Sequence, residues 1–152
     1  MMHSRSNDLI LKTTTNIIVF VILAFSINML FSGHNAPGGG FIGGLMGAGA
    51  FLLLYVSYGL QPVHRILPIN FTYMIAVGLL IAILTGAGSF VLGVPFLSHS
   101  FGYFQLPLLG KTELATAMLF DLGVYLTVIG VTMTIILSIA EDKIQKEVGE
   151  GN

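Results

Sequence analysis

The strongest constraint on this chain is the near absence of charge along its apolar stretches. Between Lys12 and Lys111 the only formally charged residue is Arg65. Charged residues make up 9% of the 152 residues, whereas soluble domains carry about 25%. Apolar runs of about 20 residues are typical of membrane-crossing helices, because a helix satisfies its backbone hydrogen bonds internally. The sequence therefore predicts an all-α membrane protein.

Four such runs divide the chain into a single predicted domain. Each run is long enough to cross a hydrocarbon core of about 30 Å at about 1.5 Å per residue. The segment QPVHRILP, residues 61–68, is expected to form a tight turn between the second and third runs. The predicted transmembrane helices cover residues 15–31, 39–59, 71–92 and 114–139, and a short, solvated polar tail follows at 141–152.

Basic residues predict the orientation of these spans. Four spans place both termini on one side of the membrane, and most of the basic residues share that side: Arg5, Lys12, Arg65, Lys143 and Lys146. The opposite side carries only Lys111. Cytoplasmic loops are enriched in lysine and arginine. Both termini are therefore predicted to be cytoplasmic.

Composition also narrows the function. The net charge is −1 and no basic cluster is present, so nucleic acid is not expected as a partner. The chain has no cysteine, which excludes disulfides, thiol nucleophiles and cysteine-based metal sites. No catalytic, metal-binding or cofactor-binding pattern stands out. We therefore expect a protein that is not an enzyme and that needs no cofactor.

A glycine-rich junction, GHNAPGGGFIGG at residues 33–44, separates the first two spans. It contains a literal G-x-G-x-x-G, but a dinucleotide site needs a preceding strand and an acidic residue about 20 positions later, and both are missing. Pro37 suits the first turn of a helix, where its missing N–H is not needed. The junction is either a plain turn or a shaped element lining an external cavity beside His34.

The same glycines continue into the second span with a regular spacing. Gly39, Gly43 and Gly47 are four residues apart, as are Gly40 and Gly44, so each set shares a helix face. Small residues on one face let another helix approach closely within lipid. The pattern predicts helix packing at Gly43, Gly44 and Gly47, and it favours a component of a larger assembly.

Asp121 is the only acidic residue within the predicted spans. A carboxylate at this depth is expected to face protein or water, because its insertion into lipid is costly. Two interpretations fit. Asp121 either pairs with a group on a partner subunit and holds the complex together, or it belongs to a hydrated cation path entered from outside past Glu113 and His34.

The segment SGHNAPGGGFIGGL, residues 32–45, resembles the MnhB-type subunit of the multisubunit Mrp (Mnh) sodium/proton antiporters, and the length and four-span layout extend the resemblance over nearly the whole chain. The resemblance implies a bacterial plasma-membrane complex that exchanges sodium for protons, with large subunits similar to the proton-pumping subunits of respiratory complex I. This chain would be an accessory subunit needed for assembly. The motif residues carried over are His34, Pro37, Gly38, Gly39, Gly40 and Phe41.

Two other functions stay open at this point. The chain could be a self-contained, homo-oligomeric ion transporter or channel, or the related subunit of a membrane-bound hydrogenase-type complex. The first alternative is weakened by the scarcity of ionisable groups in the spans, because proton relays need chains of such groups. In each case the expected surroundings are membrane lipid and, for the subunits, the other members of the complex.

Overall fold

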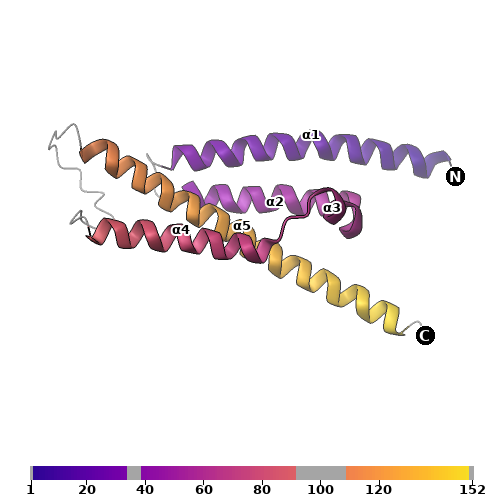
Figure 1. Ribbon diagram of the computed structural model, residues 1–152. Coiled ribbons are helices and arrows are strands. Elements are labelled where there is room, and N and C mark those ends of the chain that lie inside the picture. Colours follow the sequence, from indigo (N-terminus) through magenta and orange to yellow (C-terminus); the bar gives the residue numbers. More distant parts are fainter. Residues whose placement is uncertain (1, 34–38, 92–108, 151–152) are drawn as a thin grey trace.

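The computed structural model describes residues 2–33, 39–91 and 109–150, and every regular element in these ranges is a helix (Figure 1). The helices are α1 (Met2–Ser32), α2 (Gly39–Tyr58), α3 (Leu60–Ile66), α4 (Phe71–Val91) and α5 (Leu109–Glu150). All except α3 are long and apolar enough to cross a membrane. The predicted all-helical class with four long apolar helices is therefore confirmed.

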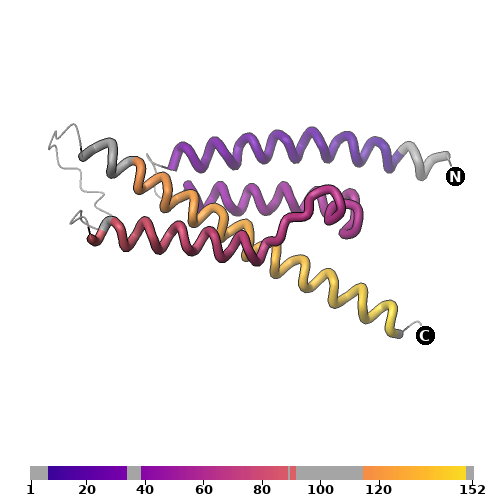
Figure 2. Tube along the Cα trace, in the orientation of Figure 1, coloured from indigo at the N-terminus to yellow at the C-terminus, as the bar shows by residue number. Residues whose placement is uncertain are grey.

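The four long helices form an open layer rather than a closed bundle. α1 packs on α2, α2 on α5, and α5 on α4, whereas the described parts of α1 and α4 do not meet. Figures 1 and 2 show this order, with α1 at one edge and α4 at the other. The most enclosed helix is α2, with 44% of its span buried, against 11% for α4. Wide apolar surfaces thus remain for lipid or for other chains.

Glycines bring the backbones of α4 and α5 into direct contact. A Cβ atom built on Gly123 would lie 2.7 Å from the carbonyl oxygen of Gly78, and one built on Gly130 would lie 2.9 Å from that of Phe71. Any side chain at these two positions would force the helices apart. Close approach of this kind is what holds helices together in lipid, where no hydrophobic drive acts between them.

The segment QPVHRILP, predicted as a turn, contains most of the seven-residue helix α3. Gly59 ends α2 with a φ of 86°, a left-handed conformation that favours glycine. Its N–H donates to the carbonyl of Tyr55 at 2.9 Å. Pro62 then falls in the first turn of α3, where a missing N–H leaves no bond unmade. These two residues explain why the chain reverses through a short helix.

Two helices extend well beyond their predicted spans. α1 begins at Met2, and α5 continues through the polar tail to Glu150. The tail contains good helix formers and an ion pair one turn apart, in which Lys146 Nζ lies 2.8 Å from Asp142 Oδ2. Both chain ends lie at the same end of the layer, where α5 projects past its neighbours (Figure 1).

Candidate functional site

Asp121 lies on α5 beside the junction of α1 and α2. It is six residues beyond Ala115, where the candidate span of α5 begins, which places it about 9 Å along the helix axis. The half-buried carboxylate faces the end of α1, because a Cβ atom on Gly33 would lie 2.5 Å from Asp121 Oδ2. The carbonyl oxygen of Asp121 lies directly against Gly40, at the start of α2. Asp121 is therefore enclosed by both arms of the junction.

The first turn of α2 gives this place a favourable electrostatic character. Gly39 begins α2 and packs against the last residues of α1, since a Cβ atom built on Gly39 would lie 2.8 Å from the backbone nitrogen of Gly33. The first amides of a helix have no intrahelical acceptor and carry partial positive charge. A carboxylate held against Gly33 therefore lies close to a helix end that stabilises negative charge.

The structure brings together only some of the predicted junction residues. Gly39 and Gly40 form the first turn of α2 beside Asp121, whereas Phe41 is 51% exposed. His34, Pro37 and Gly38 lie outside the described residues. Glu113 lies on α5 eight residues before Asp121, about 12 Å away along the axis, and its side chain also falls outside the described part. Glu113 and Asp121 are thus not neighbours on the helix.

The three predicted packing glycines of α2 face helices of the same chain. A Cβ atom on Gly43 would lie 2.8 Å from the carbonyl oxygen of Ser26 on α1. One on Gly44 would lie 2.9 Å from Val128 Cβ on α5, and one on Gly47 would lie 2.9 Å from Ile129 Cδ1 on α5. α2 is therefore wedged between α1 and α5. This smooth face is occupied within the chain and is not available to another subunit.

A buried hydroxyl cluster joins the three inner helices one turn from Asp121. Ser26 on α1 donates to the carbonyl of Gly43 on α2 at 2.7 Å, and its Oγ lies 2.8 Å from the hydroxyl of Tyr125 on α5. Ser26 has a single hydroxyl hydrogen, and that hydrogen is engaged with Gly43. Tyr125 must therefore be the donor to Ser26.

This hydroxyl cluster was not predicted from the sequence. Ser26 and Tyr125 are polar residues inside otherwise apolar spans, and Tyr125 lies four residues after Asp121, on the same helix face. That spacing is a usable signal for Tyr125. Nothing in the sequence pairs either residue with Ser26, because the contact joins segments 99 positions apart.

The donor order makes an asymmetric prediction about stability. Ser26→Ala should leave the Tyr125 hydroxyl without its acceptor, at a loss of about 1–3 kcal/mol, whereas Tyr125→Phe should remove one bond and lose about 0.5–1.5 kcal/mol. Thermal unfolding of the purified variants in detergent measures the difference. Equal losses, or a larger loss in Tyr125→Phe, would contradict the assigned donor order.

An open layer of apolar helices, with a carboxylate enclosed at a glycine-rich helix junction, defines a small multi-pass membrane protein of the kind that works in ion-transport assemblies. Residues 10–134 match the family described as "Domain related to MnhB subunit of Na+/H+ antiporter". The chain belongs to this MnhB family of antiporter subunits, as the resemblance in the sequence indicates.

Two curated relatives support this membership. The Na(+)/H(+) antiporter subunit of the same type from Bacillus subtilis (strain 168) is 59% identical over 143 residues, which are 94% of this chain and 100% of the relative. The corresponding Na(+)/H(+) antiporter subunit of Alkalihalophilus pseudofirmus is 55% identical over 142 residues, 93% of this chain and 99% of the relative. Membership makes the chain a component of a transporter rather than an enzyme.

Proposed function

We propose that the chain is an accessory subunit of a monovalent cation (sodium)/proton antiporter in the bacterial plasma membrane. Its partners would be the other subunits, including the large subunits similar to those of respiratory complex I. The observation that carries the proposal is the enclosed position of Asp121 between Gly33 and Gly40. A carboxylate kept at membrane depth, at a helix end that favours negative charge, suits a place beside a hydrated cation path.

The chain is poorly equipped to transport alone. Apart from Asp121, no acidic or basic residue falls within the predicted spans, so the chain lacks a relay of ionisable groups. Reconstitution tests this part of the proposal. Liposomes containing only the purified chain should show no sodium-dependent proton movement, whereas liposomes with the assembled complex should show it. Exchange by the chain alone would favour the self-contained transporter instead.

The position of the basic residues supports cytoplasmic termini. Arg65 on α3 and the tail residues Lys143 and Lys146 lie at the end of the layer that carries both termini (Figure 1). At the same end, Lys12 Nζ lies 5.7 Å from the ring centroid of Tyr58. Lys111 lies in the first turn of α5, at the opposite end. Lysine and arginine are enriched on the cytoplasmic side of membrane proteins.

Single cysteines provide a direct measurement of orientation, because the chain has none of its own. We expect a cysteine at Ser98, between the last two spans, to react with an impermeant maleimide on intact cells. A cysteine at Gln145 should react only after the cells are permeabilised. Labelling of Gln145→Cys on intact cells, with Ser98→Cys protected, would reverse the proposed topology.

A further inference from the structure

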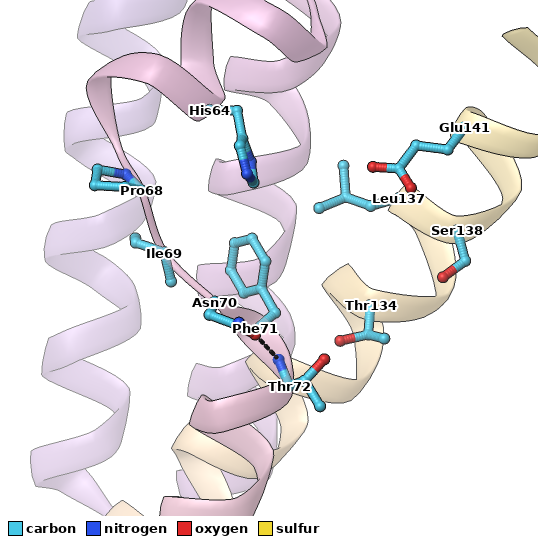
Figure 3. A pocket seen from close by; sticks show the side chains of 10 residues that line it. All are labelled: His64, Pro68, Ile69, Asn70, Phe71, Thr72, Thr134, Leu137, Ser138 and Glu141. Carbon is cyan, nitrogen blue, oxygen red and sulfur yellow. Dashed lines mark hydrogen bonds between the residues drawn. The ribbon is translucent and has the colours of Figure 1, made fainter.

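A cavity of about 370 Å³ lies at the end of the layer that carries both termini. Its walls are α3, the link between α3 and α4, the first residues of α4, and α5 from Thr134 to Glu141 (Figure 3). The volume falls in the range of about 300–1,000 Å³ that is usual for sites of small ligands. A turn and a solvated tail were predicted from the sequence here, and together they form a cavity.

The cavity is lined by polar groups of complementary kinds. Glu141 of α5 and His64 of α3 approach it from different walls, with Thr72 and Thr134 between them (Figure 3). Thr134 Oγ1 is buried and has no hydrogen-bond partner in the described part of the chain. Buried hydroxyls are almost always bonded. An unbonded one at the wall of an open cavity therefore points to a polar atom supplied from outside the chain.

The cavity is closed toward the interior of the layer. Between α4 and α5 the contact is backbone on backbone, as the positions of Gly123 and Gly130 against Gly78 and Phe71 show. No water or ion can follow this interface toward Asp121 without separating the helices. The cavity is therefore a place of binding rather than part of a continuous path.

The depth and the surroundings of the cavity match those of a lipid headgroup. The candidate span of α4 begins at Phe71, which lines the cavity, so the site lies at the boundary of the hydrocarbon core. Val131 and Ile135 are 39% and 55% exposed. They share a face of α5 with Ser138, which also lines the cavity, at spacings of four and seven residues. An acyl chain can lie along this face while its headgroup enters the cavity.

We propose that this cavity binds the phosphoethanolamine headgroup of a membrane phospholipid. The Glu141 carboxylate accepts hydrogen bonds from the ammonium group, while His64 and the hydroxyls of Thr72 and Thr134 donate to the phosphate. The carboxylate disfavours purely anionic headgroups such as phosphoglycerol. Phosphocholine is disfavoured because its quaternary nitrogen has no N–H to donate to Glu141. Basic and polar pockets between membrane helices are established sites for lipid headgroups.

A single cysteine at Ser138 reports on occupancy, because Ser138 lines the cavity and the chain has no native cysteine. The assembled complex carrying Ser138→Cys is placed in nanodiscs of phosphatidylglycerol, and part of this lipid is replaced by phosphatidylethanolamine or by phosphatidylcholine. N-ethylmaleimide labelling of this chain is followed by mass spectrometry. Phosphatidylethanolamine alone should slow the labelling, by about tenfold if the headgroup makes one charge-assisted bond.

Paired variants in the Ser138→Cys background connect the protection to the proposed contacts. Glu141→Gln should abolish the effect of phosphatidylethanolamine, whereas Asp142→Asn should keep it, because Asp142 is exposed and paired with Lys146. Thr134→Val should weaken protection, whereas Thr127→Val should not, because the Thr127 hydroxyl is bonded to the Gly123 carbonyl at 2.8 Å.

Three results would overturn the proposal. Equal protection in all three lipid compositions would assign the cavity to a neighbouring subunit or to the bilayer in general. Stronger protection by phosphatidylglycerol alone would assign it to an anion. Full protection by soluble glycerophosphoethanolamine, added to phosphatidylglycerol nanodiscs, would show that the headgroup binds without its acyl chains and that a lipid is not the source.

Discussion

Leucine at Gly43 should separate α1 from α2 and deplete the assembled complex. A Cβ atom at this position would lie 2.8 Å from the carbonyl oxygen of Ser26 and 3.3 Å from the nitrogen of Leu30, and both are backbone atoms of α1. Backbone atoms cannot turn aside as a side chain does. Overpacking typically costs about 1–3 kcal/mol, and helices in lipid have no hydrophobic drive to offset it. We expect most of the complex to be lost on native gels while the chain still inserts.

A disulfide reporter distinguishes loss of packing within the chain from loss of a partner. The hydroxyls of Thr15 on α1 and Ser57 on α2 lie 2.7 Å apart, so a pair of cysteines at these positions should oxidise readily when the two helices are packed. In the Gly43→Leu background the disulfide should fail to form. Gly49→Leu is the matched control on the same helix, because a Cβ atom there meets nothing within 4 Å. Efficient oxidation in both backgrounds would refute the packing argument.

The layout of this fold was predictable because hydropathy accumulates along the chain. Each long helix keeps its apolar character over a whole span, so four long helices could be predicted without knowing their neighbours. The boundaries were less accessible. Local signals outside the apolar runs determine them, such as the positive φ of Gly59 and the ion pair between Asp142 and Lys146. Both lie where hydropathy has already fallen.

Which surfaces meet could not be read from one sequence. The spacing of Gly43 and Gly47 predicts a close contact, but it does not distinguish a helix of the same chain from one of another subunit. The structure places α1 and α5 against these glycines. The proximity of Asp121 to Gly33 and the bond between Ser26 and Tyr125 likewise depend on how α5 crosses the α1–α2 pair. Crossing geometry depends on side-chain packing across three helices.

Asp121→Asn should reduce sodium/proton exchange strongly while the complex still assembles. Asparagine keeps the shape of the side chain and a carbonyl oxygen as acceptor, so the packing against Gly33 and Gly40 can persist. The variant loses the negative charge that a passing cation would contact. A charge-assisted contact is worth about 1.5–3 kcal/mol, which corresponds to a roughly 10- to 100-fold higher apparent KM for sodium. Exchange in everted vesicles, measured over a range of sodium concentrations and normalised to complex, provides the comparison.

The interpretation of Asp121 as a pairing residue predicts a different outcome from the same experiment. If its carboxylate only holds the complex together, Asp121→Asn should lower the amount of complex, and exchange per complex should stay at the wild-type value. Asp142→Asn is the charge-matched control, because Asp142 is on the exposed tail of α5 and pairs with Lys146. Removing its charge should change neither the assembly nor the sodium dependence. Wild-type kinetics in Asp121→Asn at matched complex levels would rule out the ion-path role, because a carboxylate beside the path cannot lose its charge without changing the binding of sodium.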